Sequence, residues 1–583
     1  MPDPAPEAAV DVAVALVQLA RETGRGAGSD QSLVRRLARG EATGPLIERA
    51  ARPELLQRLA DPEAAPPQEA GSAGRRLCGH YESLQAPASR RRRGAYYTPE
   101  RVSRAAVDLV LPEGAGAGPI VDPACGGGAF LLSAAARAPA ASLHGVDLDA
   151  TAIDVARAAL WLDAAPPGGD LPGVRDRLRV GDALRGRPGA FDGSRRATAF
   201  HWDEAFPEAV AEGGFAALVG NPPYGALAAD HPSLQHTGGH YKGLFAGGRP
   251  NAFGLFLRRA ADLVRPGGRI ALVLPRSLAR VASYAPLRTL LGGMGHVEHL
   301  VDVGRATSGV GYEQVIVVVR RGPASPDRDL TRTWHLPQAG GPPRPLLEAP
   351  QAEVIRELGI PLTLEREGLA MVRRLEASGP SLGDVARVFR GLPYSVNKPG
   401  FSVYPSPRSV PILRGEDAWR YQVEGHGWWQ DDAASAARHG RLRARLAVPK
   451  LVLPNVVSSR IRANAAFEPR GWLAFDTVTA IVPAGPRVDP FLLLAALNSR
   501  LGTFLLRDAI FCRALLTNHM DASYLGRFPL PAPSGRGASA AREAARLARA
   551  MDGEGGPGDA QIDELIAEAY GLRAAERALL QGT

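Results

Sequence analysis

The chain has 583 residues, too many for a single hydrophobic core, and we expect about three or four domains. Hydrophobic residues make up 45% of it and charged residues 22%, a balance that excludes wholesale disorder. No apolar run approaches the ~20 residues that cross a bilayer, and Met1 does not lead into a signal-like stretch. Three widely spaced cysteines cannot build a disulfide framework. We therefore expect a cytoplasmic protein without membrane contact.

The basic residues are unevenly distributed. Lys and Arg together number 69 against 60 Asp and Glu, and the net charge of +9 hints at a polyanionic partner. Only three of the 69 are lysines, so the arginine content partly reflects a general compositional bias. Residues 381–530, however, hold 19 basic and 11 acidic residues, so nearly all of the net charge falls in one C-terminal segment.

The pattern of apolar residues changes four times along the chain. Helical spacing at the N-terminus gives way to short apolar runs that alternate with helical stretches, which is typical of a parallel-sheet α/β domain. The five expected segments are a helical N-terminal region (1–88), the α/β domain (89–330), a linker with a helix (331–380), a mixed α/β domain (381–533) and a helical tail (534–583).

A glycine-rich turn follows the first expected strand of the α/β domain. It runs from Asp122 to Phe130 and opens an apolar helix. Glycines there let a ligand approach the backbone, and N–H groups at the helix start favour an anion or a polar edge. Alone, the turn fits a nucleotide-like ligand or plain tight-turn geometry.

Two further acidic residues stand at the ends of the next two strands. Asp147 lies about twenty residues after the turn, where a carboxylate can accept both hydroxyls of a ribose, and Asp182 is placed to receive an exocyclic amine. The turn lacks both the G-x-G-x-x-G and the G-K-[ST] patterns, so neither NAD nor ATP is favoured.

The fourth strand leads into Asn221-Pro222-Pro223-Tyr224. The prolines fix the backbone, so the Asn side chain is held rigidly at the carboxyl edge of the sheet. A carboxamide oxygen and a proline carbonyl can accept both hydrogens of an NH2 group and direct its lone pair at an electrophile. The Tyr ring offers a flat surface to the ring that bears the amine.

These motifs, with Gly94-Ala95-Tyr96-Tyr97-Thr98-Pro99 before the first strand, resemble the gamma-class (TaqI-like) DNA adenine-N6 methyltransferases of restriction–modification and phage-defence systems. The resemblance is strong over about residues 89–321 and loose over 381–533. It implies a doubly wound, Rossmann-like methyltransferase domain that uses S-adenosylmethionine, flanked by a helical N-terminal region and a mixed α/β target-recognition domain. Its substrate would be adenine, flipped out of double-stranded DNA.

The resemblance also assigns roles to individual residues. Asn221, Pro222, Pro223 and Tyr224 would be catalytic, Asp147 would hold the ribose of the cofactor and Asp182 its adenine. The aromatic residue that the family places near the strand Val315 to Val319 is missing, and Tyr312 is either its substitute or an ordinary packed ring. The methionine part of the cofactor would be held by Tyr97, Thr98, Pro99, Asp122, Pro123, Ala124, Cys125, Gly126, Gly128 and Phe130.

Arginines and aromatic residues alternate in the segment 381–533, as suits a surface that follows phosphates and approaches bases. A solvated helix face in an arginine-rich chain is the alternative. The densest basic positions are Arg438, Arg441, Arg443, Arg445, Arg460 and Arg462.

Several classes of function compete with DNA methylation. Protein-glutamine and RNA amine methyltransferases use the same N-P-P-Y chemistry, and a non-catalytic subunit of a defence complex is a third interpretation. No P-D…[DE]-x-K element is found, so we expect methylation without cleavage, and the N-terminal region leaves room for a restriction or defence-system partner. His231, His236 and His240 lack matching ligands, and we expect no metal site.

Overall fold

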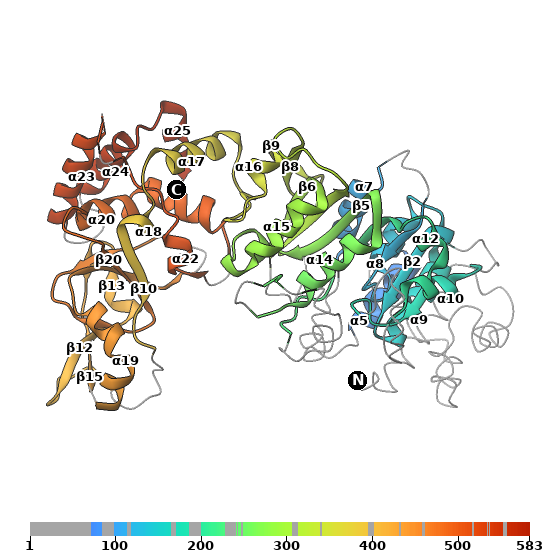
Figure 1. Ribbon diagram of the computed structural model, residues 1–583, viewed down its shortest axis with the longest axis horizontal. Coiled ribbons are helices and arrows are strands. Elements are labelled where there is room, and N and C mark those ends of the chain that lie inside the picture. Colours follow the sequence, from blue (N-terminus) through green and yellow to red (C-terminus); the bar gives the residue numbers. More distant parts are fainter. Residues whose placement is uncertain are drawn as a thin grey trace, which may run out of the picture. The chain divides into compact units, whose positions relative to one another are not determined.

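The computed structural model divides the chain into two compact units, residues 1–360 and 361–583 (Figure 1). The structure describes residues 72–83, 98–112, 118–164, 171–185, 200–227, 241, 243–245, 249–305, 313–338, 341–393, 401–430, 433–457, 461–515, 518–532, 534–535, 537–551 and 557–582.

A nine-stranded sheet forms the centre of the described part of the first unit, in the order β3-β2-β1-β4-β5-β7-β6-β8-β9. β7 runs antiparallel to both its neighbours and β9 runs antiparallel to β8, while the other pairs are parallel. The strands are β1 (Ile120–Asp122), β2 (Leu143–Asp147), β3 (Leu178–Val180), β4 (Phe215–Gly220), β5 (Val264–Pro275), β6 (Gly295–Gly304), β7 (Gln314–Arg321), β8 (Leu330–His335) and β9 (Arg344–Pro350). The α/β fold expected from the sequence is confirmed, and two strands extend its sheet over residues where a linker was expected.

Helices pack on this sheet because their apolar faces match its buried strands. Val121, Val219 and Val273, in three neighbouring strands, are all fully buried, as expected where a parallel sheet is covered on both faces. The helices of eight or more residues are α5 (Ala73–Ser83), α7 (Glu100–Val110), α9 (Ala150–Ala164), α14 (Ala252–Leu263) and α15 (Ala285–Met294); the shorter α-helices are α8 (Ala129–Ala135), α10 (Val174–Arg177), α11 (Trp202–Ala205), α12 (Pro207–Ala211) and α16 (Gln351–Val354).

The strand order reverses between β1 and β4. From β1 the chain first builds β2 and β3 on one side, and then returns to place β4 on the other. Crossover connections leave in opposite directions at such a point, so the carboxyl ends of the two strands open a crevice where α/β proteins bind ligands. Asp122 ends β1 and Asn221 follows β4, so the topology brings these two predicted residues to the same edge.

The second unit combines two small sheets with helices. One sheet has the order β10-β20-β16-β18 and the other β11-β15-β12-β19. Their strands are β10 (Ala386–Arg390), β20 (Val478–Pro483), β16 (Lys450–Pro454), β18 (Ala466–Glu468), β11 (Phe401–Ser402), β15 (Gly427–Gln430), β12 (Ser409–Leu413) and β19 (Leu473–Ala474), and two further pairs are β13 (Ala418–Trp419) with β14 (Gln422–Val423) and β17 (Val456–Val457) with β21 (Asn518–His519).

A buried ion pair ties the first of these sheets together. Lys450 Nζ lies 2.8 Å from Glu468 Oε2, and both side chains are essentially inaccessible. Burial lowers the pKa of Lys450, although Glu468 opposes that effect. The helices of this unit are α17 (Arg366–Ser378), α18 (Leu382–Val385), α19 (Ala433–Leu446), α20 (Pro490–Asn498), α21 (Arg500–Phe504), α22 (Ala522–Leu525), α23 (Ala538–Ala550), α24 (Pro557–Ala569) and α25 (Ala574–Ala578), with a π-helix over Leu505–Ile510. Across the described helices of both units, no segment has the length and apolarity to cross a membrane.

Candidate active site

The glycine-rich turn after β1 takes a conformation that requires glycine. Gly126 and Gly128 have φ angles of 52° and 98°, which residues that carry a Cβ rarely adopt. A Cβ on Gly128 would lie 3.2 Å from Ala156 Cβ, so the turn also packs tightly on α9. A Cβ on Gly126 would meet nothing within 4 Å, so the turn borders open space where a ligand can approach the backbone.

Asp147 joins this turn to the end of β2. Its Oδ2 accepts a 2.9 Å hydrogen bond from Gly126 N, and its Oδ1 accepts another of 2.9 Å from Asp149 N. Cys125 N also donates to Val146 O at 3.0 Å. These bonds hold the carboxylate at the same edge as the turn.

Asp122 is buried beneath the turn, with 1% of its surface exposed. Burial raises its pKa to about 8, helped by the nearby negative charge of Asp147 and opposed by the hydrogen bond from Ala124 N. A Cβ on Gly220 would come within 2.8 Å of Asp122 Oδ1, so the glycine before Asn221 makes room for this carboxyl group.

The third acidic residue follows β3. Asp182 Oδ1 accepts from Leu184 N at 3.1 Å, and Gly181 N donates to Asp147 O at 2.9 Å, which links the ends of β2 and β3. Tyr241 Oη and Arg259 Nη2 both donate to Leu184 O, at 3.1 Å and 2.8 Å. These two bonds hold the segment after β3 in place. Sequence reasoning missed both supports, which come from distant parts of the chain.

Two exposed apolar side chains flank these acids. Leu148 is 56% exposed and Val180 is 50% exposed, although each adjoins a strand end. Exposed apolar side chains beside carboxylates suit a flat ring with polar edges. Sequence reasoning missed them too, although an apolar residue directly after the strand-end Asp147 was a usable signal.

The Asn221 carboxamide is oriented by the residues around it. Its Nδ2 donates to the buried Thr98 Oγ1 at 3.0 Å, so its Oδ1 is the acceptor that faces Tyr224. Tyr224 Oη donates to that oxygen at 2.5 Å. Gln314 Nε2 in turn donates to Tyr224 Oη at 2.8 Å. The arrangement leaves Asn221 with an oxygen placed to accept a hydrogen from an amine.

A helix of the N-terminal region supports the turn from outside the predicted motifs. Cys78 Sγ in α5 donates to Gly127 O at 2.7 Å, and Tyr81 Oη donates to Asp149 Oδ2 at 3.1 Å. No sequence pattern had pointed to these residues. The helix therefore belongs to the structural framework of the site.

The predicted site residues fall into three groups. Thr98, Asp122, Asp147, Asp182 and Asn221 lie at or beside the carboxyl edge of the sheet. Cys125 and Phe130 are 5% and 3% exposed and pack in the core, and burial raises the pKa of the Cys125 thiol well above its usual range. Tyr97, Tyr312 and the histidines at 231, 236 and 240 lie outside the described residues, among which no cluster of three or more metal-binding side chains occurs.

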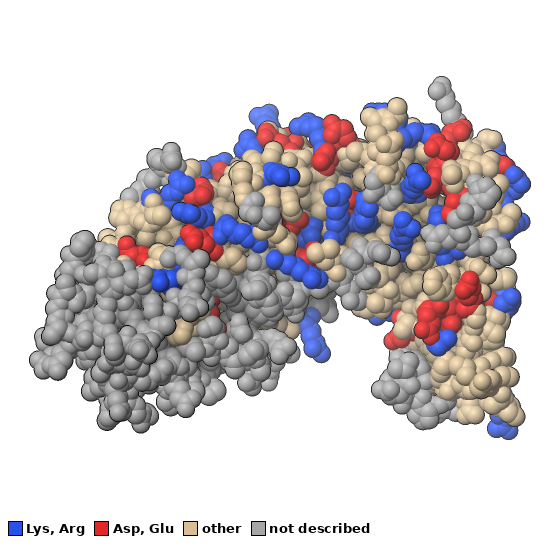
Figure 2. Space-filling view, turned by 180° about the vertical axis from the view of Figure 1, so that it is seen from behind, with Lys and Arg blue, Asp and Glu red and all other residues tan. Residues whose placement is uncertain are grey.

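The predicted arginines of the second unit are not equivalent. Arg441 and Arg462 are exposed, and Arg443 is half-buried. Arg445 is exposed, but its guanidinium lies 4.0 Å from the centre of the Phe389 ring, a cation–π contact within the unit. The Arg460 position and the Arg438 side chain lie outside the description. On the face in Figure 2, basic side chains are interspersed with acidic ones.

Known proteins of restriction–modification systems match this chain in sequence. Residues 141–308 match the family of Eco57I restriction-modification methylases. The Type II methyltransferase M.TthHB8I of Thermus thermophilus is 28% identical over 436 residues, which cover 72% of this chain and 86% of that protein. Over these residues the chain is similar to restriction–modification methyltransferases. The family resemblance inferred from the sequence is confirmed at this level.

Solved structures share the fold. The Type IIL restriction-modification enzyme MmeI, solved in complex with DNA, matches with a TM-score of 0.58 and 14% identity over 92% of this chain and 83% of that one. The DrdV–DNA complex matches with a TM-score of 0.50 and 14% identity over 92% of this chain and 66% of that one. At these identities the likeness concerns the fold alone.

Proposed function

We propose that this chain transfers a methyl group from S-adenosylmethionine to the N6 amine of adenine in double-stranded DNA. The observation that carries the proposal is the orientation of Asn221, whose Oδ1 is held as an acceptor at the topological switch point. In this proposal residues 89–330 form the catalytic domain and residues 381–533 recognise the target.

The residues at the carboxyl edge fit the cofactor. The open space at Gly126 would admit the methionine part, which Thr98 and Pro99 would help to hold, and Asp147 would accept hydrogen bonds from the ribose hydroxyls. Asp182 would accept from the adenine amine, with Leu148 and Val180 against the ring. When bound, the sulfonium supplies an electrophilic methyl group.

Asn221 would activate the target amine without a strong base. Its Oδ1 and the carbonyl of Pro222 would accept the two amine hydrogens, which draws electron density onto the nitrogen and directs its lone pair at the methyl group. The nitrogen becomes positively charged as the N–CH3 bond forms and the S–CH3 bond breaks, and it then loses one proton to solvent. The Tyr224 ring would stack on the flipped base.

The second unit would supply the DNA contacts. The relative MmeI was solved with DNA, and residues 381–530 of this chain carry a surplus of eight positive charges. The exposed Arg441 and Arg462 are the first candidates for phosphate contacts. A restriction or defence-system protein remains the proposed protein partner, and we expect no cleavage by the chain itself.

Incubation with tritiated S-adenosylmethionine and separate DNA, RNA and protein substrates tests the proposal. We expect label in duplex DNA, recovered as N6-methyladenine after nucleoside analysis. Label in glutamine of a protein or in RNA would contradict the proposed substrate and leave the amine chemistry of Asn221 in place.

A further inference from the structure

Gln314 is a buried polar residue that none of the methyltransferase motifs includes. It is the first residue of β7, and only 1% of its surface is exposed. Its Nε2 donates to Tyr224 Oη at 2.8 Å, across 90 positions of the chain. Because Tyr224 Oη donates in turn to Asn221 Oδ1, Gln314 stands at the outer end of a hydrogen-bonded series that reaches the proposed catalytic amide.

The backbone at Gln314 is fixed from both sides. It pairs with Pro275 at the end of β5 and with Gly304 at the end of β6. A buried guanidinium reinforces this junction: Arg276 lies 2.6 Å from Glu313 Oε1 and 3.0 Å from Asp302 Oδ2. The Gln314 side-chain amide therefore extends from a backbone position that is paired with both neighbouring strands.

The Tyr224 hydroxyl has two acceptors within reach. Its oxygen lies 2.5 Å from Asn221 Oδ1 and 3.2 Å from Val273 O. A hydroxyl has one proton, so it can donate to only one of them at a time. When a target amine occupies Asn221 Oδ1, the proton can turn to Val273 O while Gln314 keeps its bond to the hydroxyl oxygen.

We propose that Gln314 is a positioning residue for the target base, acting through the Tyr224 hydroxyl. It holds the Tyr224 ring in the plane where the base stacks, both before and after the amine displaces the hydroxyl from Asn221. The inference rests on the proposed function, since the base is the adenine assigned there.

Kinetics of Gln314→Met test this role. Methionine keeps the length and burial of the side chain but removes the donor. With tritiated S-adenosylmethionine and genomic DNA from a strain that lacks adenine methylation, we expect kcat to fall roughly threefold to tenfold, the range of one hydrogen bond. The dissociation constant for S-adenosylmethionine and the KM for DNA should change by less than about twofold.

A double-mutant cycle separates this role from a general loss of packing. If Gln314 acts only through the Tyr224 hydroxyl, Gln314→Met should have no further effect on kcat in a Tyr224→Phe background. Additive losses would overturn the inference.

A carboxyl group at the same position gives a pH-dependent version of the test. In Gln314→Glu the protonated carboxyl can still donate to Tyr224 Oη, whereas the ionised form has no proton to donate, so the bond that holds the hydroxyl oxygen is lost. We expect kcat relative to wild type to fall as the pH rises through the pKa of the new carboxyl, which burial raises. A ratio independent of pH would count against the mechanism.

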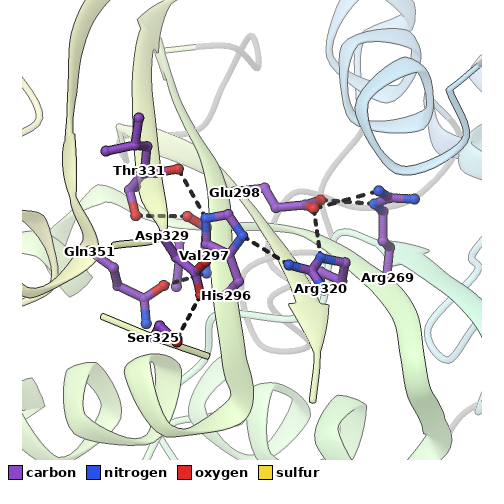
Figure 3. Close-up of polar contacts among 10 residues, drawn as sticks. Arg269, His296, Val297, Glu298, Arg320, Ser325, Asp329, Thr331 and Gln351 are labelled. Carbon is purple, nitrogen blue, oxygen red and sulfur yellow. Dashed lines mark hydrogen bonds and ion pairs between the residues drawn. The ribbon is translucent and has the colours of Figure 1, made fainter. Parts of the chain in front are cut away.

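Gln351 offers a matched control in the same unit. It is 2% exposed, and its side chain forms hydrogen bonds with backbone groups, with Val297 N donating to Oε1 at 2.7 Å (Figure 3). Neighbouring polar contacts, such as those of Glu298 with Arg269 and Arg320, are also structural. Gln351→Met should lower the melting temperature but leave kcat unchanged.

The possible outcomes distinguish a failure of the Gln314 inference from a failure of the proposed function. A wild-type protein that methylates adenine, with unaltered kcat in Gln314→Met, would overturn the inference alone. An equal loss of kcat in the Gln314→Met and Gln351→Met variants would also overturn it. A wild-type protein that transfers no methyl group to adenine would overturn the proposed function and the inference together.

Discussion

The residues at the carboxyl edge of the sheet and those on the arginine-rich helix α19 are positioned in different ways. Asp122, Asp147 and Asn221 stand at the ends of strands whose order and register the fold dictates. Arg441 and Arg445 of α19 are exposed on a helix surface, where neither their neighbours nor their distance from a ligand follows from sequence spacing alone. Short motifs are therefore informative at the edge of a sheet and much less so on a helix face.

The same contrast appears in the electrostatics. Asp122 is buried, and its pKa is raised to about 8 by desolvation. Arg441 is exposed, where water and salt screen its charge. Substitutions at the sheet edge should therefore have large effects on methyl transfer and cofactor binding, whereas substitutions on the helix should have small effects on DNA binding.

The largest effect is expected at Asn221. In Asn221→Ala the carboxamide oxygen is lost, and the rate of methyl transfer should fall by about 10²- to 10³-fold or more, since an oriented polar group at the reacting atom is removed. Binding of S-adenosylmethionine, measured by calorimetry, should survive because the proposed ribose and adenine contacts, Asp147 and Asp182, lie at or just after the ends of β2 and β3. Near-normal turnover of this variant would refute the catalytic assignment.

Asp147 should set the affinity for the cofactor. In Asp147→Asn a charged acceptor becomes a neutral one, and the dissociation constant for S-adenosylmethionine should rise roughly tenfold or more. Asp163→Asn is the control, because Asp163 accepts a bond from Gly74 N at 2.8 Å and so is a structural carboxylate on α9. Equal losses of affinity in both variants would show that Asp147 acts through stability alone.

The raised pKa of Asp122 predicts how stability depends on pH. Because the folded pKa of about 8 exceeds the ordinary carboxyl pKa of 3.8, the folded form binds the proton more tightly. The associated stability is complete below pH ~4 and is lost as the pH rises to about 8, by at most ~1.4 kcal/mol per pH unit. The melting temperature should therefore fall between about pH 5 and pH 8, and it should fall less in Asp122→Asn than in wild type. Parallel declines would contradict the assignment.

The smallest effects are expected on α19, and there two neighbouring arginines should differ. Arg441→Ala should weaken DNA binding and reduce its salt dependence by about one unit of slope, with little change in stability. Arg445→Ala removes the contact with Phe389 and should cost about 1 kcal/mol of folding free energy. Equal losses of DNA affinity in the two variants would instead make Arg445 a contact residue.

The sequence predicted the parts of the site that the strands position. The parallel fold, the turn after β1, the acids at 147 and 182 and the position of Asn221 all follow from strand ends that meet at one edge. It could not predict bonds between distant segments, such as Asn221 with Thr98, 123 positions apart, or Tyr224 with Gln314. The second pair depends on the register of β7 against its neighbours, which no local pattern encodes. The roles of Tyr97 and Tyr312 stay predictions.

The second unit was predictable only in outline. Its mixed composition indicated strands and helices, but the apolar run at Lys450 gave no sign that a buried Glu468 would pair with the lysine. Burial of a charge is decided by tertiary packing, which overrides the local preference for solvent. Tertiary packing also makes Arg445 differ from Arg441 on the same helix, because only Arg445 is described in a contact with the Phe389 ring.

The nucleoside formed in DNA tests the central claim most directly. Wild type and Asn221→Ala would be expressed in a host that lacks adenine methylation, and the digested genomic DNA would be analysed by mass spectrometry. The account predicts N6-methyladenine with the wild-type chain and none with the variant. N4-methylcytosine, or N6-methyladenine at equal levels from both, would contradict it.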